Sequence, residues 1–354
     1  MTPGVGRNVD SPAPRSADVA RVAGVSRKTV SRVLNDEPYV SDEARRRVLA
    51  AAEELGYRLN HAARALASGR SRSIGVVALG TAGYGTASLL VHIEQAVRDA
   101  GYALRVVNTP DGDPKRIAGA VESLHEQGVD GVVVSEPIVE GEVSVRVDVP
   151  VLFVGAPPAF TAARTVTVDM GAHALARAAT DHLLDLGHVT VHHLAGPQRW
   201  YASKDRLEGW RAALAARGAP EPPVVEGDWS AASGYAAGRA LAGDSSVTAV
   251  FASGDEMAVG LIHALREAGR RVPEDVSVVG FDGNPVFAYL TPALTTARQP
   301  FDAAAREGIR LLVHAIEKPD TDLPPVSDPP VELVVRGSTA PPPPHQGRTV
   351  PGTS

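Results

Sequence analysis

The chain has 354 residues and no cysteine, so it can form no disulfide bond and offers no thiolate for catalysis or metal binding. Its N-terminal segment lacks the continuous apolar core of a secretory signal peptide. No stretch approaches the about 20 apolar residues that a membrane-spanning helix needs. These absences predict a cytoplasmic protein without a membrane partner.

The net charge of −6 speaks, taken alone, against binding to nucleic acid. The distribution of charge changes that conclusion: residues 1–70 hold 12 Lys and Arg against 8 Asp and Glu, a balance of +4, so the rest of the chain carries −10. A basic head on an acidic body is expected where only one module meets phosphate groups. Ordinary solvated charged faces would explain the charge distribution equally well.

Three short helices are predicted near the N-terminus. A serine that can cap it precedes each helix, and a glycine ends the first and the third. In the second helix Val30 and Val33 share one face, and basic side chains lie on the opposite face. We therefore expect a three-helix headpiece over residues 15–60, with helices over 17–23, 27–34 and 42–55 capped by Ser16, Ser26 and Ser41.

The second of these helices follows a tight turn at Gly24, and its exposed face is basic. A helix-turn-helix motif needs this combination, because its second helix enters the major groove of DNA and its first residues reach base edges. Arg and Lys donate hydrogen bonds to guanine or to phosphates. The alternative, an unrelated helical cap with a solvated basic face, explains the joint occurrence less well. The predicted DNA contacts here are Ser26, Arg27, Lys28, Thr29, Ser31, Arg32 and Asn35.

From Ser73 onward, short β-branched runs alternate with helical segments. This alternation predicts an α/β fold with parallel sheets and helices on both faces. The alternating segments form two series of similar length, which predicts two lobes in tandem. The expected organisation is a disordered arm over 1–14, the headpiece over 15–60, a linker over 61–72, a two-lobed core over 73–336 and a disordered Pro-rich tail over 337–354.

Several sequence segments resemble the lactose-repressor/galactose-repressor family. AGVSRKTVSRVLN, VSDEARRRVLAAAEELGYRLN and AARALASGRSRSIGVV are similar to its headpiece, hinge and first core strand, and the similarity continues through LAGP, RLEGW, EGDWSAASGY, VPEDVSVVGFD and TPALTTARQPF. It covers roughly residues 15–336. The resemblance implies a periplasmic-binding-protein-like core and a homodimeric transcription repressor. It also implies double-stranded operator DNA and a sugar-like effector as partners.

The resemblance also assigns a role to the linker. In the family this segment becomes a helix on operator DNA, and a leucine pries apart a central base step from the minor groove; the matching residue is Leu66. A helix of about two turns is marginal alone, so coupling its formation to DNA binding is physically reasonable. The alternative is that Leu66 anchors the linker against the core. Asn60 and Ala63 are further expected DNA contacts.

A sugar site between two lobes needs an aromatic surface and planar charged groups for paired hydroxyls. The resemblance implies that Arg206 and Asp282 bind hydroxyls and that Trp229 packs on the sugar ring. Asp282 also ends a predicted strand, and such strand ends face the ligand crevice in open α/β sheets. A tryptophan in Trp229's local sequence would, without the resemblance, more often belong to the core. The resemblance adds Asp255, Gln299 and Phe301 to the expected effector-binding residues.

Two glycines depart from the family pattern. Gly254 stands where the family commonly has an asparagine, and Gly155 stands where the lactose repressor has an aspartate. Because a side chain that would bind a sugar hydroxyl is missing, the effector is not expected to be a plain galactoside.

Enzymatic and cofactor functions are not expected. The glycines of Gly80–Gly85 follow a strand but lack GxGxxG spacing, so this segment is predicted to be a ligand-facing loop rather than a dinucleotide site. Four histidines between 182 and 193 have neither a cysteine nor an HExxH motif nearby, so no metal site is expected. A periplasmic sugar-binding protein would share the core but lack the headpiece, and a Rossmann-like enzyme would need a dinucleotide fingerprint. The tail after Arg336 contains no leucine and four consecutive prolines, which predicts a dimer rather than a coiled-coil tetramer.

Overall fold

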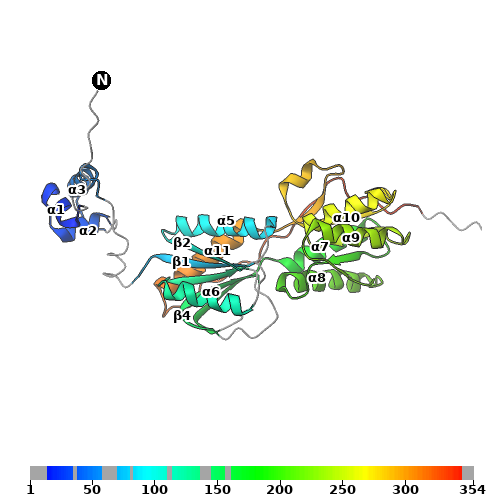
Figure 1. Ribbon diagram of the computed structural model, residues 1–354, viewed down its shortest axis with the longest axis horizontal. Coiled ribbons are helices and arrows are strands. Elements are labelled where there is room, and N and C mark those ends of the chain that lie inside the picture. Colours follow the sequence, from blue (N-terminus) through cyan, green and yellow to red (C-terminus); the bar gives the residue numbers. More distant parts are fainter. Residues whose placement is uncertain are drawn as a thin grey trace, which may run out of the picture. The chain divides into compact units, whose positions relative to one another are not determined.

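The computed structural model describes residues 14–34, 38–57, 70–79, 83–109, 114–135, 145–155 and 161–344. The chain divides into two units, one ending at Ser71 and the other beginning at Arg72 (Figure 1). Most of the predicted linker lies outside the described residues. The expected DNA contacts Asn35, Asn60, Ala63 and Leu66 lie there too and stay predictions.

The small unit contains three helices, α1 (Ser16–Ala23), α2 (Arg27–Leu34) and α3 (Asp42–Glu54). Two of the three expected caps are confirmed: the Ser26 hydroxyl accepts from the Thr29 N–H at 3.1 Å, and the Ser41 hydroxyl accepts from the Ala44 N–H at 3.3 Å. The expected cap at Ser16 is wrong. Ser16 is already helical, because the Asp18 carboxylate reaches back to the Arg15 N–H at 2.9 Å and starts the helix one residue earlier.

The core of the small unit lies where the three helices meet. Val19, Val30 and Val48 come one from each helix and are completely buried. Gly24 ends α1 with a left-handed backbone (φ +64°) and redirects the chain into α2. Because the apolar face of α2 is buried in this core, its basic face is left at the surface.

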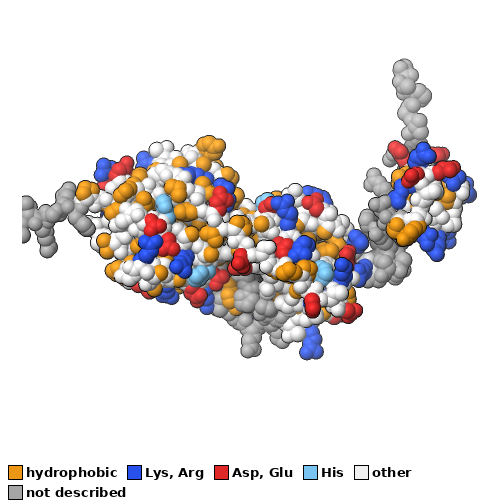
Figure 2. All heavy atoms as spheres, turned by 180° about the vertical axis from the view of Figure 1, so that it is seen from behind, with side chains coloured by type: hydrophobic (Ala, Val, Ile, Leu, Met, Phe, Trp, Pro, Cys, Tyr) orange, Lys and Arg blue, Asp and Glu red, His pale blue; other side chains and the backbone are white. Residues whose placement is uncertain are grey.

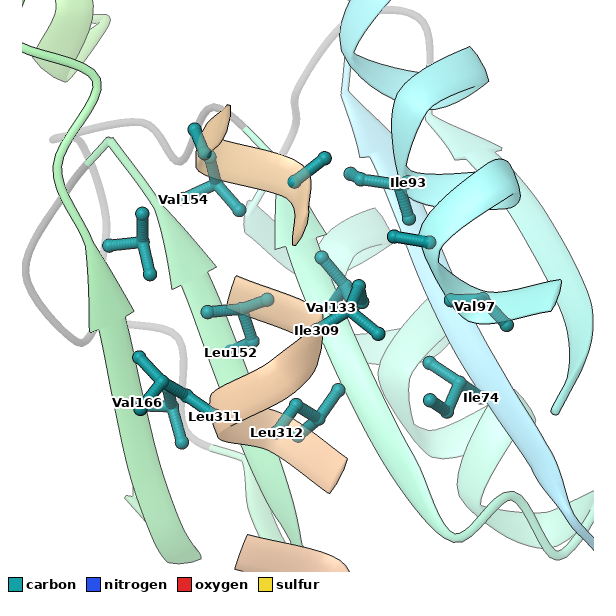
Figure 3. Packing of buried hydrophobic residues seen from close by; sticks show 14 of the residues in the cluster. Ile74, Ile93, Val97, Val133, Leu152, Val154, Val166, Ile309, Leu311 and Leu312 are labelled. Carbon is teal, nitrogen blue, oxygen red and sulfur yellow. The ribbon is translucent and has the colours of Figure 1, made fainter. Parts of the chain in front are cut away.

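The first lobe of the large unit is a five-stranded parallel sheet in the order β2-β1-β3-β4-β5. Helices α5 (Tyr84–Asp99) and α11 (Phe301–Glu317) cover one face, and α6 (Pro114–Glu126) covers the other. Figure 3 shows Ile309 and Leu312 of α11 beside Leu152 and Val133 of the sheet. The strands are β1 (Ser73–Leu79), β2 (Ala103–Thr109), β3 (Gly131–Ser135), β4 (Arg146–Val154) and β5 (Thr161–Val168).

The second lobe is a six-stranded sheet in the order β11-β10-β9-β8-β6-β7, parallel except for β11. Helices α7 (Ala172–Asp185) and α8 (Tyr201–Arg217) pack on one face. Helices α9 (Ala231–Ala242) and α10 (Asp255–Glu267) pack on the other. The strands are β6 (His192–Ala195), β7 (Val225–Glu226), β8 (Ala249–Ala252), β9 (Ser277–Asp282), β10 (Thr295–Arg298) and β11 (Glu332–Val334).

The two lobes are not arranged in simple tandem, so the expectation of two consecutive series is wrong. The chain crosses between the lobes after β5, after β10 and after α11. Helix α11 therefore belongs to the first lobe, although it follows the strands of the second lobe in the sequence. The physical reason is burial: the apolar face of α11 covers sheet residues of the first lobe that water would otherwise reach.

Disorder beginning at residue 337 is also wrong. The Ser338 side chain is completely buried, donates to the Val278 carbonyl at 2.6 Å and accepts from the Thr295 N–H at 2.8 Å. The Val278 N–H in turn donates to the Ser338 carbonyl at 2.8 Å. Residues 337–340, here called the C-terminal strap, thus provide partners for backbone groups where β9 and β10 begin. Residues 345–354 lie outside the described part of the chain.

Candidate functional site

A cleft opens between the two lobes of the large unit, with a volume of about 540 Å³ that includes solvent at its mouth. The first lobe contributes the beginning of α5, residues 83–86. The second lobe contributes segments that follow β6, β7 and β8 and the last residue of β9, so the cleft lies at the carboxyl ends of parallel strands, as open α/β sheets predict. The second-lobe residues are Trp200, Ala202, Arg206, Trp229, Gly254, Glu256 and Asp282.

Arg206 is the buried cation of this cleft. It comes from α8, and only 4% of its surface is exposed. One guanidinium nitrogen lies 3.5 Å from an Asp282 carboxylate oxygen, and another donates to the Ser253 carbonyl. The guanidinium carbon is 3.9 Å from the centre of the Phe281 ring and 5.2 Å from that of Trp229. These contacts hold the planar group in one orientation.

Asp282 is the buried anion opposite it, 9% exposed and the last residue of β9. Its backbone is left-handed (φ +108°), an uncommon conformation for a non-glycine residue that is often found at functional sites. The Gln299 amide donates to its carboxylate at 2.6 Å. Gln299 does not itself line the cleft. Gln299 thus orients Asp282, and its expected direct contact with the effector stays a prediction.

Trp229 lines the cleft and also packs against core clusters of both lobes. Its ring lies directly over Gly196, where any added Cβ would collide with it. Trp229 is therefore positioned both as a core residue and as an aromatic surface that a ligand in the cleft can contact. Gly196 has to be glycine for the ring to lie there.

Two further expected effector contacts lie behind the lining. Asp255 is completely buried and accepts from the Thr296 hydroxyl at 2.6 Å and from the Asn284 N–H at 2.8 Å. Burial, reinforced by the charge of Asp282, raises the pKa of Asp255 well above its ordinary value. Phe301 meets the Tyr84 ring edge-on, with ring centres 6.1 Å apart. Asp255 thus holds the loop after β9, and Phe301 supports a cleft residue. A direct effector contact by either residue stays a prediction.

Sequence reasoning missed Tyr84, Trp200 and Glu256 as individual cleft residues. The Tyr84 N–H donates to the Glu256 carboxylate at 3.2 Å, which joins the two lobes. Tyr84 belongs to the glycine-rich segment predicted to face a ligand, and the described part of that segment does line the cleft. Glu256 adjoins Asp255, and both follow a buried strand. That position was the sequence signal that could have identified Glu256.

The small unit presents a second candidate site on α2. Arg27, Lys28 and Ser31 are exposed, and Thr29 and Arg32 are half-buried above the apolar residues of the helix. The Ser26 hydroxyl also lies 2.9 Å from the Thr29 hydroxyl, which ties the cap to the first turn. Figure 2 shows Lys and Arg side chains on the surface of this unit. These side chains can donate to bases or phosphates without losing any contact in the core.

The histidine-rich segment takes part in packing. The His193 ring stacks on Trp210 and Phe251, with ring centres 5.2 and 4.9 Å apart, and burial lowers its pKa to about 3. Among the described residues, no group of His, Asp or Glu is arranged to hold a metal ion. None of the described helices is long and apolar enough to cross a bilayer.

Comparison with known proteins gives matches along most of the chain. Residues 17–60 match bacterial regulatory proteins of the lacI family, and residues 180–339 match a periplasmic binding protein-like domain. The transcriptional regulator CelR of Thermobifida fusca is 35% identical over 329 residues, which is 90% of this chain and 94% of that protein. The ribose operon repressor of Escherichia coli K12 is 33% identical over 314 residues, 85% of this chain and 93% of that protein.

Solved structures agree with these matches. A lac repressor dimer bound to operator and the anti-inducer ONPF is similar with a TM-score of 0.77 at 28% identity, over 93% of this chain and 100% of that one. A complex of CelR with cellobiose is similar with a TM-score of 0.67 at 33% identity, over 92% and 99%. The expected headpiece-and-core fold is thereby confirmed. The chain belongs to the LacI family of bacterial DNA-binding transcription regulators.

Proposed function

We propose that this regulator represses transcription as a homodimer and that a sugar-like effector in the cleft controls its affinity for operator DNA. The observation that carries the proposal is the buried pair of Arg206 and Asp282 beside Trp229. A planar cation and a carboxylate can bind neighbouring hydroxyls, and an aromatic ring can cover the apolar face of a sugar. Such desolvated, prearranged groups suit a small polar ligand.

The connectivity supports control of DNA binding from this cleft. The headpiece is joined by the linker to β1, in the first lobe, whereas Arg206 and Asp282 belong to the second lobe. A ligand that changes the angle between the lobes would shift the start of β1 and, through the linker, the headpieces of a dimer. By linkage, operator DNA must then change effector affinity by the same factor. Leu66 would act at this joint by inserting into the operator.

The names of the relatives indicate which effectors to try first. CelR has been solved with cellobiose, and another relative is a repressor of the ribose operon. Gly254 replaces an asparagine common in the family, so a galactoside is a poor first choice. We propose an uncharged mono- or disaccharide, with cellobiose and ribose as the first probes.

The test uses an operator selected by the protein itself from random DNA duplexes. Operator affinity is measured by fluorescence anisotropy during titration with a panel of neutral sugars that begins with cellobiose and ribose. We expect one of them to change operator affinity and tryptophan fluorescence over the same concentration range. Asp282→Asn keeps the side chain's shape but removes its charge, and should weaken the response by about tenfold or more. Asp185→Asn, which removes an exposed carboxylate at the end of α7 outside the cleft lining, is the matched control. A normal response in Asp282→Asn would put the effector site elsewhere.

A further inference from the structure

Glu256 makes a hydrogen bond across the cleft. It lies in the first turn of α10, in the second lobe, and is half-buried in the lining. Its carboxylate accepts from the N–H of Tyr84, the first residue of α5, in the first lobe. A side chain of one lobe thus caps the N-terminus of a helix of the other lobe.

The beginning of α5 is, by its construction, suited to a negative group. The helix has 16 residues, and Gly83 in front of it provides no side chain to cap it. Gly83 and Gly85 place no side chain between this helix end and the cleft, which residues 83–86 line. Backbone N–H groups and the helix dipole attract phosphate and carboxylate groups at such an end. The Glu256 carboxylate is at the position that a ligand's phosphate would take.

The charges in the lining point the same way. Among the lining residues that the structure describes, Arg206, Glu256 and Asp282 are charged. Arg206 is paired with Asp282, so the negative charge of Glu256 is left in excess. An anionic ligand would meet this charge at short range in a partly desolvated cleft, where repulsion is stronger than in water.

We propose that Glu256 is a specificity-determining residue whose carboxylate occupies the N-terminus of α5 and excludes anionic effectors, namely phosphorylated or carboxylated sugars. That the excluded ligands are effectors rests on the proposed function above. The exclusion itself rests on the hydrogen bond to Tyr84 and on the charges of the lining. Glu256 thereby restricts the cleft to ligands without a negative charge, whichever sugar they are.

Inorganic phosphate tests the exclusion without an effector or an operator. Glu256→Ala removes the carboxylate and exposes the helix end, whereas Glu256→Gln keeps an acceptor of the same shape and removes only the charge. Phosphate binding to the full chain is measured by calorimetry. It is also followed through the Tyr84 amide resonance after ¹⁵N-tyrosine labelling, since the chain has only 7 tyrosines and Tyr84→Phe assigns the signal.

We expect Glu256→Ala to bind phosphate roughly tenfold or more tightly than the wild type, with the Tyr84 amide shifted, and Glu256→Gln to lie between them. Glu267→Gln is the matched control, because it removes an exposed carboxylate from the last turn of the same helix, where the Tyr235 hydroxyl donates to it. Circular dichroism verifies that each variant is folded.

Two outcomes overturn the proposal. In the first, the wild-type protein binds phosphate as tightly as Glu256→Ala and with the same shift of the Tyr84 amide. In the second, neither Glu256 variant binds phosphate more tightly than the wild type. If no sugar alters operator binding, the proposed function fails while the phosphate result still stands. The two failures are therefore distinguishable.

Discussion

The two units of this regulator place their functional side chains in opposite environments. In the small unit, Arg27 and Lys28 are exposed above a core built from three adjacent helices. In the large unit, Arg206 and Asp282 are almost completely buried, in a cleft between two lobes. Solvated cations suffice for DNA, whose phosphates attract them at long range. A small polar ligand needs groups that are already desolvated and oriented, so in the proposed site the same residues would serve both binding and stability.

Removing the C-terminal strap should produce the largest difference in stability between the two units. The small unit is built from contiguous residues, whereas the large unit depends on the C-terminal strap. Ending the chain after Arg336 leaves the Val278 and Thr295 N–H groups without partners, at about 1–3 kcal/mol each in free energy of unfolding. Urea denaturation should show the large unit destabilised and the headpiece helices retained.

The control is a chain that ends after Pro344, which keeps every strap contact. Its stability, operator affinity and dimeric mass by light scattering should equal those of the full chain. A tetramer that falls to a dimer with this shorter deletion would contradict our view that residues 345–354 play no part in assembly.

Removing one arginine from each unit tests the comparison directly. Arg206→Ala leaves Asp282 buried without its cation and should cost about 3–5 kcal/mol in free energy of unfolding. Arg27→Ala, at the surface, should change stability by less than about 0.5 kcal/mol but weaken operator binding by about 1–3 kcal/mol and relax preference at one base pair. Denaturation and anisotropy on both variants provide the measurements. Equal losses of stability in Arg206→Ala and Arg27→Ala would contradict the contrast between the buried and the exposed arginine.

Acid should destabilise the large unit through its buried histidines. Burial lowers the pKa of His193 to about 3, and burial also lowers the pKa of His182 and His188. A histidine whose folded-state pKa is depressed stabilises the fold above its unfolded value of 6.5, and this contribution is lost as the pH falls below that value. For His193 the loss between pH 7 and pH 5 is about 2 kcal/mol.

His193→Phe keeps a stacked ring and removes the titration, so the free energy of unfolding of this variant should depend less on pH over this range. Exposed His263→Gln should behave like the wild type. Asp255, whose pKa is raised, contributes with the opposite sign, because its protonated form is favoured in the folded state. The difference between wild type and His193→Phe therefore isolates His193. An unchanged pH dependence in His193→Phe would contradict the assignment.

The secondary-structure elements that were predicted from the sequence have strong local signals, and several of those that were missed do not. The headpiece helices, β1 and β9 were all expected, because caps and apolar periodicity are local signals. Helices α9 and α11, strand β5 and the short strands β7, β10 and β11 were missed. Strand β11 has only three residues and β7 only two, too short for any periodicity to show.

The residues predicted for the candidate site also fall into two groups, those that line the cleft and those that face away from it. Arg206, Trp229 and Asp282 were predicted as effector contacts by resemblance, with a strand end as independent support for Asp282, and all three line the cleft. Asp255 was also predicted by resemblance and also follows a buried strand, yet it is turned inward to Thr296 and Asn284. Whether a side chain at a strand end faces the ligand or the loop beneath it depends on neighbours from other segments.

The sequence by itself determined the headpiece with its basic helix, the alternation of strands and helices, and the family. Only the tertiary structure decided that α11 belongs to the first lobe, that Ser338 provides partners for the first residues of β9 and β10 in the second, and that Glu256 reaches Tyr84. Periodicity, caps and turns are properties of neighbouring residues, so a single sequence reveals them. The partner that covers an apolar face, or that pairs with a buried polar group, comes from a distant segment, and local pattern carries no information about which one.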